Sequence, residues 1–478
     1  MSDAPVHMRN SDAFSWYMER DPALRSTIVA VLGLDRAPDR ERLTTRTDRL
    51  TRELPMFRQR VVEPPWRLAT PRWVVDGAFD LSWHVRWQPL PSWDDVMELA
   101  RREAMTAFDT ARPLWKSTVI EGLPDGQAAV VMKLHHSLTD GVGGMEMALR
   151  LFDLEPQADE PPMPEPPAAE AVGGFDLVRE ALAGDVRQVI GAGTRAMVRG
   201  VPMAVGALRS PMGALRRATD LAASVLRTVQ PVSHAGSPLM TDRQLGRQLA
   251  TIEVPTAALR GAAQAAGSTI NDAFMAAIAG GLVRYHDHHD MPLDRLRVTL
   301  PINIRTSDDP VGGNRITLQR FDLPTTEPDV MARMRAIHDI CHRAMAEPAV
   351  PHTDAIAGSL NLLPTGVVGS MLKHVDVVAS NVPGFPFPVF LAGAPVRSYH
   401  AFGPTIGASL NLTLISYHET CFIGVTIDTA AAPDVEVLIS CLRAGFDEVI
   451  EEARRRQSPT AARPSRARGG QPAASART

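Results

Sequence analysis

Two adjacent histidines, His135 and His136, open the stretch HHSLTDG, which continues to Asp140 and Gly141. A neutral imidazole has an unperturbed pKa of about 6.5, so it can accept a hydroxyl proton and return it near neutral pH. Two imidazoles can also ligate a metal ion, and either ring can serve as packing. The residue types alone therefore leave general base catalysis, metal binding and packing open.

The segment before the motif, QAAVVMKLHH, predicts a strand that ends at the histidines, and GGMEMALRLFDL predicts the helix that follows. Neighbouring side chains of a strand point to opposite faces, so His135 and His136 are not expected to face one ligand. This counts against a shared metal ion and for unequal roles. His136 is expected to look into an apolar interior where a lipid-like substrate can lie, because it shares its face with Val130, Met132 and Leu134.

Asp140 and Gly141 lie in a loop at the carboxyl end of that strand, where α/β folds commonly place their sites. Asp140 has two possible roles: it can hydrogen-bond the imidazole and set its tautomer, or pair with a buried arginine and hold the loop. Gly141 permits a turn and a close approach of another backbone.

A second histidine cluster, YHDHHD, covers Tyr285–Asp290. His286 and His288 have the spacing of metal ligands on a strand, and two aspartates stand beside them. The cluster follows an apolar helix and precedes a strand-like segment. We therefore expect a polar surface loop, with a metal site as the alternative.

The chain has 478 residues, of which 45% are hydrophobic, and a formal charge of −4. This length predicts two domains, and the charge does not indicate a nucleic-acid partner. The three cysteines form no close pair, which favours a reducing, cytoplasmic setting. The N-terminus lacks the apolar core of a signal peptide. The longest strongly apolar run, Ala273–Val283, covers about half a membrane span, so no transmembrane helix is expected.

Four segments are expected along the chain. Residues 1–154 and 243–456 each read as mixed α/β, with alternating strand-like and helix-like stretches. Residues 155–242 combine a Pro- and Glu-rich linker with a crossover that has eight arginines against four acidic residues over 176–227. Those arginines are either solvated or form a basic amphipathic surface on anionic lipid. Residues 457–478 have the composition of a disordered basic tail.

The motif H-H-x-x-x-D-G resembles that of the coenzyme A-dependent acyltransferase superfamily, which includes chloramphenicol acetyltransferases and peptide-synthetase condensation domains. Further stretches resemble the bacterial wax ester synthase/diacylglycerol acyltransferase family in order and spacing. They are Pro113-Leu114-Trp115, Asn271-Asp272, Pro301–Arg305 with Gly313-Asn314-Arg315, and Ser380-Asn381-Val382-Pro383-Gly384. The resemblance runs from about Asp12 to Arg454. Phe385 departs from it, since the family pattern has proline there, and the wall of the tunnel is expected to differ locally.

The resemblance implies an α/β fold of two similar chloramphenicol-acetyltransferase-like domains with a tunnel at their interface. It implies that His136 deprotonates the hydroxyl of a diacylglycerol or a long-chain alcohol, which then attacks the thioester of acyl-coenzyme A. Acyl-coenzyme A is a substrate, and no cofactor or metal ion is implied. The enzyme would work at the cytoplasmic face of the plasma membrane or on lipid droplets.

The resemblance also assigns roles around the base. His135, Asp140 and Gly141 would support it, and Arg58, Arg60 or Arg305 would pair with Asp140. Candidate substrate-binding residues are Pro113, Leu114, Trp115, Asn271, Asp272, Ser380 and Asn381. Each of these has an alternative reading as packing, helix capping or turn chemistry. Two other functions stay open: acylation of a polyketide or peptide-type acceptor, and binding to a lipid surface without catalysis.

Overall fold

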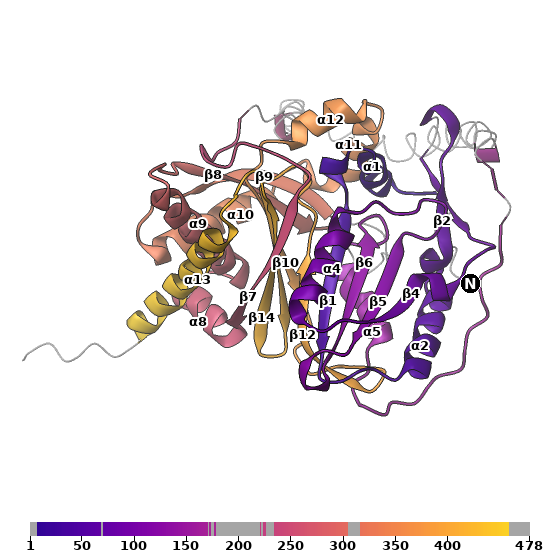
Figure 1. Cartoon of the computed structure of the whole chain (residues 1–478). Coiled ribbons are helices and arrows are strands. Elements are labelled where there is room, and N and C mark those ends of the chain that lie inside the picture. Colours follow the sequence, from indigo (N-terminus) through magenta and orange to yellow (C-terminus); the bar gives the residue numbers. More distant parts are fainter. Residues whose placement is uncertain are drawn as a thin grey trace, which may run out of the picture.

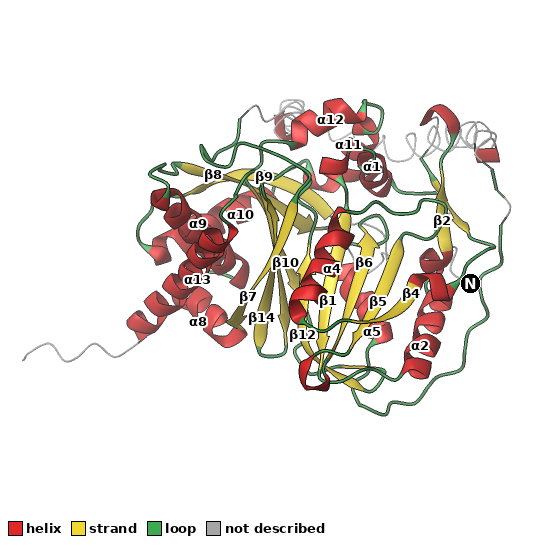
Figure 2. Cartoon of the chain, viewed as in Figure 1, coloured by secondary structure: helices red, strands yellow, loops and turns green. Residues whose placement is uncertain are grey.

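The structure is a computed structural model of the 478-residue chain, and it describes residues 7–67, 70–170, 172–173, 176–177, 220, 223–225, 234–304 and 316–457. Two mixed six-stranded sheets dominate these residues, each covered by helices (Figures 1 and 2). The α/β prediction with two halves is therefore confirmed. Most of the crossover predicted over 176–227, and all of the tail 458–478, lie outside the described residues.

The first sheet has the order β11-β12-β1-β6-β5-β4. Its strands are β1 (Thr27–Leu34), β4 (Val85–Pro89), β5 (Trp115–Glu121), β6 (Ala128–His135), β11 (Phe390–Leu391) and β12 (Ala394–Phe402). Helix α4 (Trp93–Met105) buries Val96 and Ala100 against Val29 and Val131 on one face. The opposite face packs on α5 (Gly141–Leu151), and α2 (Arg40–Glu53) lies beside α5.

The second sheet has the order β7-β14-β13-β10-β8-β9. Its strands are β7 (Arg247–Pro255), β8 (Arg295–Asn303), β9 (Ile316–Pro324), β10 (Val377–Pro383), β13 (Leu410–Tyr417) and β14 (Thr420–Asp428). One core joins this sheet to α8 (Thr256–Ala266), α9 (Ile270–His288), α10 (Val330–Met345) and α13 (Val435–Gln457). Helix α9 is apolar on nearly all sides because it lies in the middle of that layer.

Two strands from the C-terminal half complete the first sheet. Strand β12 pairs antiparallel with β1, with Val29 opposite Phe402 and Gly33 opposite Ser398. The predicted domain boundary at residue 243 thus differs from the division between the sheets. The alternation of apolar and polar side chains along a strand indicates which of its faces is buried. Backbone hydrogen bonds are the same in either sheet, so the sequence does not tell which sheet β12 joins.

The linker after the first half runs along α2. Arg42, Arg49 and Arg52 of that helix donate hydrogen bonds to the backbone carbonyls of Pro156, Pro162 and Pro164. Arg46 forms an ion pair with Glu160 at 3.3 Å. A segment whose prolines provide no backbone N–H is thereby held through its carbonyls.

Three helices lie together at the top of the view in Figure 1. They are α1 (Asn10–Met18), α11 (Thr353–Leu360) and α12 (Thr365–Leu372). Asp354 of α11 accepts hydrogen bonds from the Asn10 side chain and the Ser11 backbone N–H, both at 3.2 Å. The first and the C-terminal parts of the chain thus meet again away from the sheets.

The expectation of a surface loop over Tyr285–Asp290 is wrong, because α9 continues to His288. His286 is fully buried, and its two ring nitrogens contact the Ser237 hydroxyl and the Leu282 carbonyl, both at 2.7 Å. Tyr285 is also fully buried and hydrogen-bonds Asp434. Because nearly all sides of α9 are buried, these polar residues lie in the core as well. Among the residues described here, no group of His, Cys, Asp and Glu has the geometry of a metal site.

The two sheets approach each other most closely at Gly424 of β14. A Cβ at this position would overlap the carbonyl oxygen of Ala401 on β12. Both backbones are held in their ladders, Gly424 opposite Thr413 and Ala401 opposite Ala30.

We expect Gly424→Ala to lower the free energy of unfolding by about 1–3 kcal/mol, because neither backbone can move away cheaply. Urea unfolding measures this change. The control is Gly261→Ala in α8, where a Cβ meets no atom within 4 Å; it should be neutral or stabilising by up to about 1 kcal/mol. Equal effects of the two substitutions would contradict close packing of the sheets at Gly424.

Candidate active site

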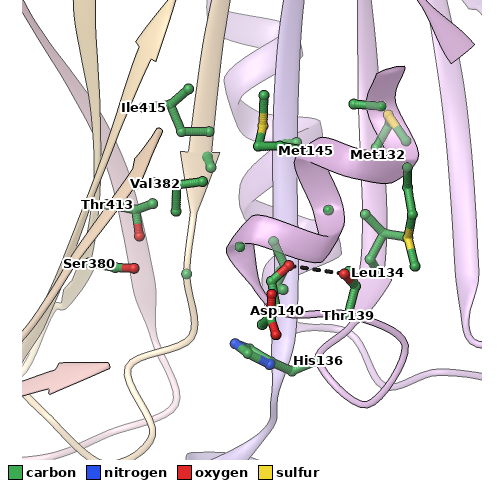
Figure 3. A pocket seen from close by; sticks show the side chains of 18 of the residues that line it. Met132, Leu134, His136, Thr139, Asp140, Met145, Ser380, Val382, Thr413 and Ile415 are labelled. Atoms are coloured by element: carbon green, nitrogen blue, oxygen red, sulfur yellow. Dashed lines mark hydrogen bonds between the residues drawn. The ribbon is translucent and has the colours of Figure 1, made fainter. Parts of the chain in front are cut away.

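His136 lies one residue beyond β6 and faces the space between the two sheets (Figure 3). Met132 and Leu134 line the same cavity, as the alternation of side chains predicted. The backbone N–H of His136 donates to the Ser26 carbonyl at 2.8 Å, which extends the pairing with the strand β1 by one residue. The imidazole is therefore placed by the strand ladder itself.

His135 points the other way and is fully buried. Its Nδ1 accepts from the backbone N–H of Ser137 at 3.1 Å and lies 2.7 Å from the Ser137 hydroxyl. The rings of Trp16 and Phe108 stand edge-on to it, with centroids 6.1 and 5.7 Å away. The two histidines thus share no ligand, and a packed aromatic environment surrounds the first.

Glu19, which the sequence did not single out, holds both histidines. One carboxylate oxygen lies 3.4 Å from Nε2 of His135 and accepts the backbone N–H of Ser26 at 3.0 Å. Ser26 in turn accepts the N–H of His136. One buried carboxylate therefore positions the ring of the first histidine and the backbone of the second. Glu19 directly follows helix α1 and lies 116 residues before His135 in the sequence. No local sequence pattern marks it.

Asp140 caps α5. Its side-chain oxygen accepts the backbone N–H of Gly143 at 2.8 Å, and its carbonyl accepts that of Gly144. The side chain is almost fully buried and lines the same cavity as His136. Asp140 therefore starts the helix and also puts a negative charge near the imidazole.

Gly141 is a point of contact between the two halves. A Cβ there would stand 2.6 Å from a methyl group of Val382 on β10. The lack of a side chain lets the helix start reach the second sheet, where the neighbour is a side chain and not the backbone expected from the sequence. No left-handed backbone conformation is recorded at Gly141, so a turn does not explain the glycine.

Two cavities meet at His136. The first has a volume of about 1160 Å³, which includes space open to solvent. Its walls are α5 and the first sheet on one side and strands β10 and β13 on the other. The second, of about 1180 Å³, lies among α1, α11, β8 and β9. Both walls are mainly aliphatic. The residues common to both cavities are His136, Ile316, Leu318, Val378 and Ile406. His136 is the titratable side chain at this junction.

A small polar group faces the histidine across the first cavity. Ser380 of β10 and Thr413 of β13 stand opposite each other in the parallel ladder and point toward the side of His136 and Asp140 (Figure 3). Thr413 donates to the side chain of Asn411 at 2.8 Å, and Asn411 donates to the Pro404 carbonyl. Asn381 is exposed and does not line either cavity, since it follows Ser380 on an alternating strand.

Burial lowers the pKa of His136, because the charged imidazolium loses its hydration. The negative charge of Asp140 opposes this shift, and the neighbouring His135 adds to it. The imidazole is consequently neutral at neutral pH and free to accept a proton.

The motif Pro113-Leu114-Trp115 lies in the core of the first half. Leu114 is fully buried, and Trp115 stacks on His84 with centroids 4.5 Å apart and donates to the Phe57 carbonyl at 2.8 Å. None of the three residues lines either cavity. Their geometry is that of packing, which was the alternative reading.

Asn271 and Asp272 begin α9 and lie away from both cavities. Asp272 forms a capping box with Thr269 and contacts His338 at 2.8 Å. Asn271 reaches Met275 within its own helix. Asp272 therefore caps a helix, which was the alternative reading of this motif.

Of the arginines proposed as partners of Asp140, Arg58 pairs with Asp48 and donates to the Thr51 hydroxyl at 2.9 Å. Arg60 lies in β2 (Gln59–Val62), part of a separate two-stranded sheet. Arg305 and the Gly313-Asn314-Arg315 motif lie outside the described residues.

Phe385, where the family pattern has proline, is buried and stands edge-on to Phe152 with centroids 5.7 Å apart. Phe152 lines the first cavity. Phe385 therefore packs behind the cavity wall, and a different wall from that of the family remains a prediction.

The contact at Gly141 gives a specific prediction. Gly141→Ala should lower the melting temperature by several degrees, because the methyl group overlaps Val382, and overpacking costs about 1–3 kcal/mol. Trimming the partner in Gly141→Ala/Val382→Ala should recover part of this loss. Thermal unfolding followed by circular dichroism measures both.

Gly144→Ala is the matched control, since a Cβ there meets Thr139 at an ordinary 3.7 Å. It should leave the melting temperature within about a degree or raise it slightly, because alanine favours a helix. If Val382→Ala does not relieve Gly141→Ala, the two halves are not in contact at this glycine.

Comparisons with known proteins identify a family. The family description "Wax ester synthase/diacylglycerol acyltransferase catalytic domain" matches residues 8–274, and "WS/DGAT C-terminal domain" matches residues 312–449. A relative from Mycobacterium tuberculosis (strain ATCC 25618 / H37Rv), provisionally named a diacylglycerol O-acyltransferase, is 36% identical over 442 residues, covering 90% of this chain and 89% of its own.

Solved structures have the same fold. The wax ester synthase/diacylglycerol acyltransferase from Marinobacter aquaeolei VT8 aligns with a TM-score of 0.63 at 21% identity, covering 94% of this chain and 99% of its own. The starter condensation domain of rhizomide synthetase, crystallised as a mutant with C8-CoA, aligns with a TM-score of 0.58 at 13% identity, covering 94% of each chain. With a catalytic-domain match over more than half its length and a relative at 36% identity, the chain belongs to the wax ester synthase/diacylglycerol acyltransferase family.

Proposed function

We propose that this protein moves a long-chain acyl group from acyl-coenzyme A to the hydroxyl group of diacylglycerol, and also to long-chain alcohols. The observation that carries the proposal is the position of His136 at the junction of two mainly aliphatic cavities. One cavity can take the acyl chain and the other the apolar part of the acceptor, so that thioester and hydroxyl meet at His136. The names of the relatives support the substrate class.

His136 acts as the general base in this proposal. Its imidazole takes the proton of the acceptor hydroxyl as the oxygen bonds to the thioester carbonyl carbon. The tetrahedral intermediate then expels the thiolate of coenzyme A, and the imidazolium returns the proton to that sulfur. Atoms and charge balance without a covalent acyl-enzyme. The C8-CoA bound to the rhizomide condensation domain, which has the same fold, is consistent with a coenzyme A thioester as donor.

Ser380 is the residue we assign to the other side of the reaction. Its hydroxyl faces the first cavity opposite the histidine side. A donor in that place stabilises the oxyanion that develops on the thioester carbonyl. Asp140 fixes the loop of the base and keeps negative charge beside the imidazolium that forms during the reaction.

A direct assay tests the function. Labelled palmitoyl-coenzyme A is offered with dioleoylglycerol, with hexadecanol and with water alone, and the products are separated. His136→Ala should reduce the rate by about 10²–10⁴-fold, the usual contribution of a general base. The control is His288→Ala, an exposed residue at the end of α9, which should keep full activity. Product formation with neither acceptor, or an unimpaired His136→Ala protein, would overturn the proposal.

The pH dependence tests the role of Asp140. Its charge raises the pKa of His136, so Asp140→Asn, which keeps an oxygen for the helix cap, should lower that pKa. The neutral imidazole is the active form. The acid limb of kcat/KM therefore lies below pH 6.5 in the native enzyme and moves to lower pH in the variant. A limb that stays in place or moves to higher pH would contradict an electrostatic role for Asp140.

A further inference from the structure

An uncharged stretch of surface stands beside the second cavity. Residues 355–372, which form most of α11 and all of α12, contain no acidic or basic side chain. Leu362 is 79% exposed, Val367 48% and Leu363 38%. Helices on the surface of a soluble protein normally carry charges on the solvent side. The described part of the chain leaves this corner apolar and open to solvent.

A tryptophan from a distant segment joins the corner. Trp66 is 79% exposed, and both Trp66 and Arg67 have left-handed backbone angles, with φ of 55° and 54°. The Arg67 guanidinium lies over the Tyr17 ring and makes long hydrogen bonds to the Asn361 carbonyl and the Thr365 hydroxyl, at 3.5 and 3.4 Å. A strained turn is thus attached to α11 and α12 while its indole points outward. Strain of this kind is kept where it serves a function.

The inner side of the same two helices belongs to the second cavity. Ile356, Ala357, Leu360 and Leu372 line it, and His136 lies at its inner end. A mainly apolar surface, with Arg320 among the residues that line it, therefore continues from the outside of the corner to the imidazole. In Figure 1 these helices lie beside α1 at the top of the view.

We propose that this corner, formed by Trp66, Leu362, Leu363 and Val367, inserts into the surface of a phospholipid layer and that the acceptor enters the second cavity from there. This rests on the proposed function, which requires a lipid acceptor. Tryptophan favours the boundary between headgroups and acyl chains, and leucine and valine favour the apolar side. Arg67 and Lys373 flank the corner, where headgroup phosphates would lie.

A lipid layer fits this corner better than a second copy of the chain does. A stable dimer buries about 800 Å² on each partner, and four side chains provide much less. Shallow insertion needs only a few apolar side chains. In the sequence, the corner is distinct from the basic segment 176–227, for which an electrostatic attachment to anionic lipid was the alternative. Insertion of uncharged residues predicts binding that salt hardly weakens, because screening acts on charges.

Flotation of the full-length protein with phosphatidylcholine vesicles that contain dioleoylglycerol tests the proposal. Leu362→Asp/Val367→Asp should weaken vesicle binding at least about tenfold, because two carboxylates must enter the apolar layer. The matched control is Leu149→Asp/Leu154→Asp, two leucines that are 53% and 66% exposed elsewhere; it should bind like the native protein. Circular dichroism checks that both variants are folded.

Two further measurements sharpen the outcome. Vesicles should shift tryptophan emission to shorter wavelength in the native protein and less so in Trp66→Phe, and binding should change less than about twofold between 0.1 and 1 M salt. The His136→Ala protein should bind as well as the native one, so docking is read independently of catalysis.

Undiminished binding of the Leu362→Asp/Val367→Asp protein would overturn the proposal. Loss of binding in high salt would do so as well, and would assign attachment to a basic surface. A protein that ignores vesicles but forms a dimer that these two substitutions abolish would show that a second copy covers the corner.

Discussion

Hydrogen bonding between β1 and β6 is the constraint on which the site depends. The pairing runs without a shift from Thr27 opposite His135 to Leu34 opposite Ala128, and the bond from His136 to Ser26 continues it. A shift of one residue would turn every side chain of β6 to the other face and put His135 into the cavity. The ladder is central in its sheet, with β5 on the other side of β6, so its register is held from both sides.

The cavity at that strand end exists only because the two halves are locked together. Strand β12 leaves the second half to pair with β1, and the sheets then come close enough that Gly424 and Gly141 have no room for a side chain. Residues of both halves form the walls around His136. Neither half contains the cavity by itself.

The apolar walls act on the histidine as well as on a lipid. Removal of water lowers the pKa of His136, so the same environment that suits an acyl chain keeps the imidazole neutral. Polar groups in the first cavity are few, and Thr413 and Asn411 are satisfied by hydrogen bonds to each other and to the backbone. The uncharged residues 355–372 of α11 and α12 extend this environment to the outer surface. Glu19 contacts His135, and Asp140 caps α5 in the same cavity as His136.

The sequence by itself determined the strands and helices around the motif, the opposite orientations of His135 and His136, and the family. These follow from alternation, helical periodicity and motif order, all of which are local or can be read in one dimension. Tertiary structure alone decided that β12 joins the first sheet, that Trp115 and Asp272 serve packing and capping away from the cavities, and that His286 is buried in a helix. It also brought Glu19 to His135 and Trp66 to the corner of α11 and α12. Those partners lie far apart along the chain, and packing in three dimensions selects them because backbone geometry carries no information on which distant surface a side chain will meet.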